Sequence, residues 1–145
     1  MILTTKGRYA VMAIVDLHEE GGTDKMAKPI SLLSISKRQN ISLSYLEQIF
    51  SNLRKCEIVD SVKGPGGGYV LKKDPREITI ADIALATGEN IKMTICKNSS
   101  GGCALAKKNK QKTCKTHDLW HGLEKSINGY LDSISIYDIC KNGNN

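Results

Sequence analysis

Residues 31–71 read SLLSISKRQNISLSYLEQIFSNLRKCEIVDSVKGPGGGYVL, and this stretch decides the fold. Ser31 comes before a short apolar repeat, which predicts a helix over residues 31–39 with Ser31 as its cap. Asn40 suits a tight turn, and the next apolar repeat predicts a second helix over about residues 43–55. Two short helices joined by a tight turn indicate a helix-turn-helix.

A β-hairpin is predicted directly after the second helix. Residues 58–63 alternate weakly between apolar and polar types, and residues 69–71 form a second short apolar run. Between them, the GPGGG sequence that starts at Gly64 is too small and too flexible for a core element, and it can lie close to a DNA backbone. A hairpin that follows a recognition helix is the wing of a winged helix. We therefore predict that residues 1–75, which end at Pro75, form a winged helix-turn-helix DNA-binding domain.

Further helices are predicted on both sides of this module. Before it, residues 4–20 read as a helix that the pair Gly21-Gly22 ends. After it, residues 80–87 read as a helix, and a helix of about 17 residues begins near Thr116. The predicted fold class is mainly α with a small β-hairpin wing, in which a winged helix-turn-helix is followed by a long C-terminal helix.

The composition excludes several classes of protein. The 145 residues include 40% hydrophobic and 25% charged residues, so a buried core is expected rather than wholesale disorder. No window approaches 18 uncharged apolar residues, and no export signal opens the chain, so neither a membrane span nor export is expected. Five cysteines in such a chain point to the reducing cytoplasm, where thiols act as metal ligands or reactive groups rather than disulfides.

The net charge of +6 is concentrated in one segment. Residues 90–117 hold seven lysines and no acidic residue, whereas residues 1–89 hold 12 basic and 11 acidic residues. The lysine-rich segment also holds three of the five cysteines. The net charge therefore does not by itself indicate DNA binding. Evidence for DNA binding has to come from the pattern of residues.

The second predicted helix carries two different faces. Its apolar residues recur at i, i+3, i+4 and i+7 and form a stripe that we expect to be buried: Leu46, Ile49, Phe50 and Leu53. Its polar residues have the same spacing on the opposite side: Ser44, Glu47, Gln48 and Ser51. Short hydroxyls, a carboxylate and an amide are able to address base edges in a major groove.

Glu47 is the most informative residue of this polar face. A carboxylate repels phosphate, so its place in a DNA interface is to accept a hydrogen bond from a cytosine amino group. Arg54, Lys55 and Lys63 flank the face and are candidates to hold the DNA backbone. The alternative is an ordinary solvated helix in which Ser44 and Glu47 form a capping box.

Three cysteines and a histidine follow the winged helix with the spacing C-x6-C-x10-C-x2-H: Cys96, Cys103, Cys114 and His117. Three thiolates and an imidazole complete a four-ligand metal set. Cys114 and His117 are one turn apart at the start of the long predicted helix, so both side chains can point the same way. Spacing does not decide between zinc and an iron–sulfur cluster, and a chance grouping of cysteines also stays open.

The remaining cysteines and histidines are assigned other roles. Cys56 and Cys140 have no cysteine or histidine neighbour in sequence and are expected to be semi-buried structural thiols. His18 lies beside two acidic residues and is expected on a solvent-exposed face. His121 lies four residues after His117 and is able to replace it as a ligand, but an exposed side chain is the preferred interpretation.

Four stretches of the sequence match a known family: LTTKGRYA at 3–10, ISLSYLEQ at 41–48, LRK at 53–55 and VKGPGGGY at 62–69. They closely resemble the Rrf-two family of bacterial winged-helix transcription factors and, within it, the IscR-like iron–sulfur cluster regulators. The resemblance runs from Met1 to about Asp138, which is nearly the whole chain.

The resemblance implies a homodimer in which the long C-terminal helix crosses between subunits, so that residues 76–145 hold the dimerisation helices and the cysteine-rich loop 90–117. It implies one 2Fe–2S cluster per subunit, held by Cys96, Cys103, Cys114 and His117. It also implies that double-stranded operator DNA is contacted by Ser44, Glu47, Gln48, Lys63 and Gly64. The target genes that the resemblance implies are those of iron–sulfur cluster assembly. It also implies that the assembly machinery donates the cluster. The regulator itself is expected in the bacterial cytoplasm, associated with the nucleoid.

The sequence departs from the family's pattern at three places. The gap of ten residues between Cys103 and Cys114 is longer than usual and contains four lysines. Lys63 stands where arginine is common, which removes the fork geometry of a guanidinium at a phosphate or base. Cys56 stands where a polar residue is usual.

The sequence as a whole predicts a sequence-specific DNA-binding transcriptional regulator, repressor or activator, whose activity depends on a 2Fe–2S cluster. The alternative on the same fold is a zinc-bound or thiol-sensing winged-helix repressor without an iron–sulfur cluster. An enzyme built on a Cys–His pair such as Cys114 and His117 is not expected. No oxyanion-donor motif lies beside the thiol, and no third group is present to orient the imidazole.

Overall fold

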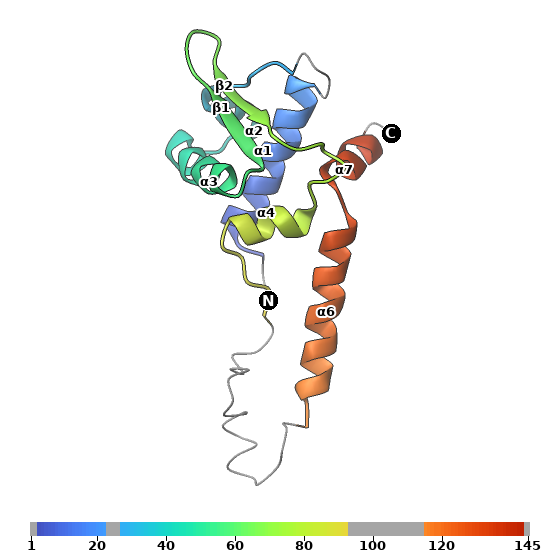
Figure 1. The fold of residues 1–145 in the computed structure, drawn as a ribbon. Helices are drawn as coiled ribbons and strands as arrows, with labels where there is room; N and C mark the ends of the chain where they lie inside the picture. The colour runs from blue at the N-terminus through green and yellow to red at the C-terminus, as the bar shows by residue number, and fades with distance from the viewer. Residues whose placement is uncertain (1–2, 23–26, 93–114, 144–145) are drawn as a thin grey trace. The chain divides into compact units, whose positions relative to one another are not determined.

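Six helices and one two-stranded sheet make up the part of the chain that the computed structural model describes, residues 3–22, 27–92 and 115–143 (Figure 1). In chain order the elements are α1 (Thr5–Gly21), α2 (Leu32–Gln39), α3 (Leu43–Lys55), β1 (Val59–Val62), β2 (Gly68–Leu71), α4 (Ile80–Ala86), α6 (His117–Ser133) and α7 (Ile136–Asn142). The chain divides into two compact units, one of residues 2–90 with 131–145 and the other of residues 91–130. The predicted helices and the hairpin are all present, so the mainly helical winged fold is confirmed.

Hydroxyl side chains set the starts of the first three helices. Thr4 caps α1 by accepting a hydrogen bond from the amide of Gly7 at 3.4 Å. Ser31 caps α2 and Ser42 caps α3, each by accepting from the amide three residues later at 3.2 Å. Asn40 then closes the tight turn between α2 and α3, because asparagine tolerates the left-handed backbone conformation found there, with φ at 54°.

One apolar core joins α1, α2, α3, α4, α7 and the sheet. Fully buried side chains come from all of these helices and from β1: Ile14 and Leu17 in α1, Ile35 in α2, Phe50 in α3, Val59 in β1, Ile83 in α4 and Ile136 in α7. Burial of one such side chain contributes about 1.5–3 kcal/mol. The core therefore holds α3, which carries the predicted recognition face, in a fixed orientation within its unit.

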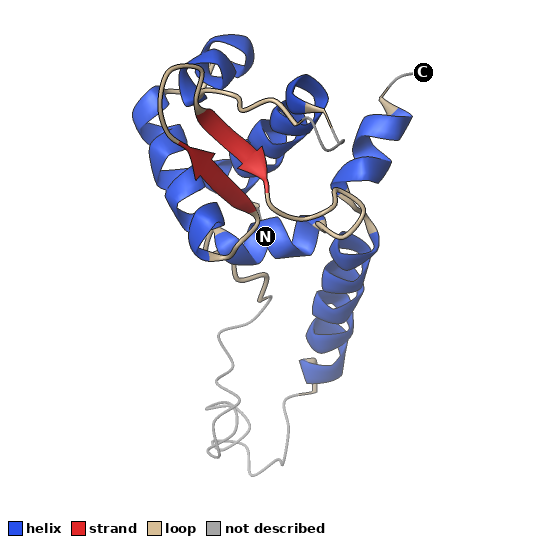
Figure 2. Cartoon of the chain, turned by 45° about the horizontal axis from the view of Figure 1, so that its top comes forward, coloured by secondary structure: helices blue, strands red, loops and turns tan. Residues whose placement is uncertain are grey.

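The wing is an antiparallel hairpin of β1 and β2, with Val59 opposite Leu71 (Figure 2). Ile30 pairs with the other edge of β2, because its N–H and C=O both bond to the backbone of Tyr69, at 3.0 and 2.8 Å. The ring of Tyr69 also packs on that of Phe50 in α3, with 4.9 Å between centroids. The base of the wing is thereby anchored to the helix-turn-helix.

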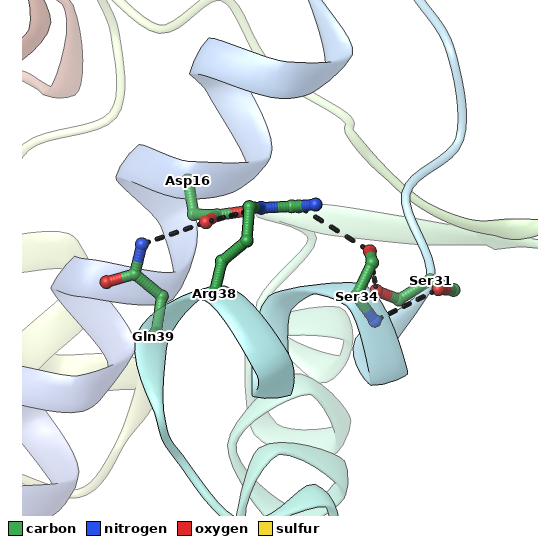
Figure 3. Close-up of polar contacts among 5 residues, drawn as sticks. All are labelled: Asp16, Ser31, Ser34, Arg38 and Gln39. Carbon is green, nitrogen blue, oxygen red and sulfur yellow. Dashed lines mark hydrogen bonds and ion pairs between the residues drawn. The ribbon is translucent and has the colours of Figure 1, made fainter.

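A buried carboxylate fastens α2 to α1 (Figure 3). Asp16 of α1 is 3% exposed and accepts hydrogen bonds from two nitrogens of Arg38 of α2, from Nη2 at 2.7 Å and from Nε, which is shared between both carboxylate oxygens, at 3.0 and 3.3 Å. Gln39 Nε2 is a third nitrogen donor to the same carboxylate, at 2.8 Å. The hydrogen bond to Asp16 raises the pKa of the Arg38 guanidinium. Because planar donors converge on one acceptor, the network fixes the direction of α2 as well as its distance from α1.

The last helix, α7, belongs to the same unit as the winged helix. Ile136 N donates to Ile78 O at 2.9 Å, and Ile80 N donates to Ile134 O at 3.0 Å, so the segments that lead into α4 and α7 run side by side. The division of the chain at Pro75 into a DNA-binding and a dimerisation domain stays a prediction.

Helix α6 exposes much of its apolar surface. None of its residues is buried, and Leu119, Leu123 and Tyr130 are 61%, 40% and 66% exposed. In the part of the chain that the structure describes, no helix is long and apolar enough to cross a membrane.

Two predictions about single residues are wrong. Cys56 is exposed rather than semi-buried, because it forms the C-cap of α3 at a sharp turn in which Glu57 has φ at 59°. His18 is 8% exposed rather than on an open face, because α1 packs against α7. Cys140, predicted to be semi-buried, is buried at 8% exposure.

The burial of His18 predicts a pH dependence of stability. Burial lowers the pKa of His18 below its ordinary value of 6.5, against the smaller opposing influence of Glu19 and Asp74. Below the ordinary pKa, the unfolded chain binds a proton that the folded chain does not, so stability is lost as the pH falls through this window. We expect the free energy of unfolding to decrease between about pH 7 and pH 5.5, and to decrease less in His18→Gln. Urea unfolding across this range measures both slopes, and equal slopes would contradict the prediction.

Candidate nucleic-acid interface

Helix α3 presents one face to the core and the other to solvent. The predicted apolar stripe is confirmed, since its four residues are all 0% exposed: Leu46, Ile49, Phe50 and Leu53. The predicted reading face is exposed along its length: Ser44, Glu47, Gln48 and Ser51. We call these four residues the reading face. Its orientation toward solvent is a consequence of the burial of the opposite stripe.

The capping-box interpretation of Ser44 and Glu47 is wrong. Ser42, not Ser44, is the N-cap of α3, and its hydroxyl accepts from the amide of Tyr45. The hydroxyl of Ser44 lies 3.5 Å from that of Ser42. Glu47 forms no ion pair with any other residue in the described ranges. The carboxylate of Glu47 is therefore available to an incoming hydrogen-bond donor.

The reading face is one wall of an open hollow of about 540 Å³. Two residues outside the predicted set line the same hollow, Lys6 from the first turn of α1 and Asn52 from α3. Lys6 brings a positive charge to a surface whose charged residue is otherwise Glu47, and Asn52 adds an amide that can donate and accept. Sequence spacing along α3 does not reveal Lys6, which lies about forty residues earlier; its only sequence signal is the LTTKGRYA motif.

The cationic residues that flank the reading face differ in whether they form ion pairs. Arg54 Nε lies 3.6 Å from Asp60 Oδ1 of β1, and both side chains are about half exposed. Exposed pairs of this kind contribute little to stability, so Arg54 can exchange Asp60 for a phosphate. Lys55 and Lys63 are exposed and form no ion pair with another described residue.

The backbone of the wing tip requires glycine. Gly64 has φ at 99°, in the region that side chains disfavour. A Cβ on Gly67 would lie 2.2 Å from the carbonyl oxygen of Val62, so no larger residue fits there. Lys63 and Pro65 are exposed beside these glycines. The tip therefore offers exposed backbone and one cation to a partner that approaches closely.

Only one of the four candidate metal ligands lies among the residues that the structure describes. Cys96, Cys103 and Cys114 lie outside them, whereas His117 is the first residue of α6. The ring of His117 lies parallel to that of His121, which is exposed, with 6.0 Å between centroids and 5° between planes. Within residues 3–22, 27–92 and 115–143, no three His, Cys, Asp or Glu side chains come together as a metal site.

The sequence profile of the Rrf2 family, described as an iron-dependent transcriptional regulator, matches residues 3–142. Two relatives named HTH-type transcriptional regulator IscR align over 144 residues, which is 98% of this chain. The one from Photorhabdus laumondii subsp. laumondii is 46% identical and 80% covered, and the one from Escherichia coli (strain K12 / DH10B) is 44% identical and 82% covered.

Solved structures give the same result. CymR, described as the global cysteine regulator of B. subtilis, superposes with a TM-score of 0.75 at 30% identity, over 97% of each chain. IscR of T. potens superposes with a TM-score of 0.72 at 34% identity, over 99% of this chain and 88% of that one. Given this similarity over nearly its whole length, and a winged helix-turn-helix with an exposed reading face, the chain belongs to the Rrf2 family of transcriptional regulators, as an IscR-like DNA-binding member and not an enzyme.

Proposed function

We propose that this protein is a homodimeric transcriptional regulator whose choice of DNA sites depends on a 2Fe–2S cluster in each subunit. The observation that carries the proposal is the exposed reading face of α3 beside Lys6, combined with a four-ligand set in the same chain. Residues that would contact operator DNA are Ser44, Glu47, Gln48, Ser51, Arg54, Lys55, Lys63 and Gly64, with Lys6 added. In this proposal, the reading face contacts base edges, and the cations and the wing contact phosphates.

The donor set fits an iron–sulfur cluster. Three cysteine thiolates and one imidazole supply four ligands, and ligation by a nitrogen atom is a known way of changing the reduction potential of such clusters. Cys96, Cys103, Cys114 and His117 would hold it. When bound, a cluster supplies a centre that responds to iron supply and to oxidants. The seven lysines of residues 90–117 offset the charge of the thiolates.

Helix α6 supports the homodimer. A helix without buried residues that exposes Leu119, Leu123 and Tyr130 is unusual for a monomer, because apolar surface of this extent is unfavourable in water. Pairing with the same helix of a second subunit covers it. Two reading faces related by a two-fold axis then match a palindromic operator.

Ligation links the metal site to this helix. His117 starts α6, so a bond at its imidazole holds the first turn of the helix in one orientation. A change at that end alters how the two α3 helices are presented to DNA. Switches of this type typically couple the two sites by about 1–3 kcal/mol, or about 5- to 150-fold in affinity. We further propose that the target genes encode iron–sulfur cluster assembly in the bacterial cytoplasm and nucleoid, and that this machinery donates the cluster.

A zinc-bound or thiol-sensing repressor on the same fold is the second candidate. The similarity to CymR, described as a cysteine regulator, favours it. Anaerobic purification separates the two: a coloured protein that contains iron and sulfide supports the cluster, and a colourless protein that contains zinc supports the alternative.

Glu47→Ala is expected to change which DNA sequences are bound. Without the carboxylate, a site that lacks the matching cytosine is no longer penalised, and discrimination at that base pair falls by about 1–3 kcal/mol. Lys55→Ala is the matched control, because loss of a phosphate contact weakens all sequences about equally. Selection of bound duplexes from a random pool, followed by affinity measurements, tests both variants. Identical enriched sequences for wild type and Glu47→Ala would contradict the assignment of the reading face.

A further inference from the structure

A second hollow, of about 490 Å³, lies between the end of β2, the C-terminal end of α1 and α7. This volume is within the range of about 300–1,000 Å³ that is typical of small-molecule sites. The described residues that line it all belong to one unit, residues 2–90 with 131–145. Leu71 lines it and pairs with Val59 at the base of the wing, so the hollow is at the opposite end of the hairpin from the wing tip. It shares no lining residue with the hollow at the reading face.

Backbone hydrogen bonds hold the walls of this hollow in place. Tyr137 N donates to Pro75 O at 3.2 Å, which joins α7 to the chain that leaves β2 (Figure 1). Lys72 N donates to Ile58 O at 2.9 Å and continues the pairing of the hairpin beyond β2. Leu17 of α1, which is 2% exposed, and Pro75, which is buried, give the wall an apolar part. Because the site is preformed, a ligand would not have to order it.

The charged residues that line this hollow are four cations and one acid: Lys28, Lys72, Lys73, Arg76 and Asp74. We call it the basic hollow. Its carboxylate is already engaged, because Asp74 Oδ1 accepts from the backbone N–H of Arg76 at 2.8 Å. Lys72 has an acidic partner, Glu57, at 3.1 Å, whereas the other two lysines form no ion pair with another described residue. The lining therefore carries a positive excess that favours an anion.

Arg76 is arranged to receive a flat anionic group. Its guanidinium carbon lies 4.5 Å from the ring centroid of Tyr137, so the ring supports one face of the guanidinium. Stacking leaves the in-plane N–H groups free to donate, and they match the two oxygens of a carboxylate or phosphate. Arg76 Nη1 lies 3.6 Å from Asp74 Oδ2, and both side chains are largely exposed, so an incoming anion can replace this weak contact.

We propose that the basic hollow binds a small organic anion: Arg76, Lys28 and Lys73 hold its carboxylate or phosphate group, and its apolar or ring-shaped body packs between Leu17 and Tyr137. This site is separate from the reading face and uses none of the candidate cluster ligands, so the inference goes beyond the proposed function. A molecule bound here contacts α1, β2 and α7 together. Since it binds only the folded chain, it stabilises the folded state.

Four variants separate the contributions of charge and geometry. Arg76→Ala removes the cation and the planar fork together, whereas Arg76→Lys keeps the charge and loses the fork. Lys73→Ala removes a cation of the hollow. Lys37→Ala is the charge-matched control, since Lys37 is exposed on α2 and does not line the hollow. All three positions are exposed, so the variants are expected to fold like the wild type.

Calorimetric titration of the full-length protein with AMP and, separately, with phenylpyruvate distinguishes a phosphate-bearing ligand from a carboxylate-bearing one. Adenosine is the uncharged control. We expect at least one of the two anions to bind with a Kd below about 1 mM and to raise the Tm, and adenosine to do neither. Affinity for that anion is expected to fall about 10- to 100-fold in Arg76→Ala, and less in Arg76→Lys and Lys73→Ala. In Lys37→Ala it is expected to change by less than about 2-fold.

Several results would overturn this assignment. One is that neither AMP nor phenylpyruvate binds at about 5 mM. Another is that the affinity is the same in Arg76→Ala, or falls equally in Lys37→Ala, which would show general attraction of anions to a basic protein. Loss of DNA affinity in Arg76→Ala without loss of anion binding would assign this cation to DNA phosphates instead. None of these results bears on the cluster or on the reading face, so the proposed function is tested separately.

Discussion

Phe50→Ala is expected to lower the free energy of unfolding by about 3–5 kcal/mol, as is typical when a buried phenylalanine is truncated. Phe50 is 0% exposed, and its ring packs at 64° against that of Tyr69 in β2. The substitution leaves a cavity at the point where α3 meets the wing, in a core that is too well packed to close around it. The effect reaches function, because the same helix carries the reading face on its opposite side.

Chemical denaturation measures this loss. Ser51→Ala is the matched control, since Ser51 is the next residue but lies on the exposed face, where a substitution is expected to change stability by at most about 0.5 kcal/mol. Phe50→Leu, which retains part of the side-chain volume, is expected to lie between the two and remains measurable if Phe50→Ala does not fold. A loss below about 1 kcal/mol for Phe50→Ala would contradict the packing described for α3.

Cys114→Ala is expected to abolish cluster binding. With one of four ligands removed, three remain, and the helix that begins at His117 loses the neighbouring thiolate. The expected result is a colourless protein without stoichiometric iron or sulfide. Its DNA selectivity is expected to equal that of the wild type stripped of its cluster, with the fold retained.

The chain offers good controls for this experiment. Cys56→Ala removes an exposed thiol, and Cys140→Ala removes a buried one, and neither belongs to the proposed ligand set. Both variants are expected to keep the full absorption spectrum. His121→Ala tests the nearby imidazole in the same way, since its ring stacks on that of His117. Retention of the cluster in Cys114→Ala would contradict the ligand set, and loss in Cys56→Ala would show that the assignment of the thiols is wrong.

The small net charge of the winged helix-turn-helix means that its hydrogen-bonding groups, rather than overall attraction to phosphate, decide which DNA sites it binds. Residues 1–89 are almost neutral overall, and Arg54 and Lys72 are engaged by Asp60 and Glu57. The remaining attraction to phosphate comes from a few cations such as Lys6 and Lys63. Site choice in such a module depends on base contacts and on exact placement of those cations.

Local signals in the sequence determined the elements of this protein. Ser31, Ser42 and Asn40 set the ends of α2 and α3, because capping and turn formation involve residues within a few positions of each other. The apolar stripe that includes Phe50 followed from helical periodicity alone, and so did the polar face opposite, with Glu47.

Only the tertiary structure decided which distant residues share a surface. The burial of His18, the exposure of Cys56, and the convergence of Arg38 on Asp16 all depend on contacts between elements. Lys6 beside the reading face and Glu89 on Gly7 join segments far apart in the chain. Periodicity states which side of a helix is apolar, but it does not state which element will cover that side. That choice is made by packing of the whole core, where volume, buried charge and backbone pairing have to be satisfied together.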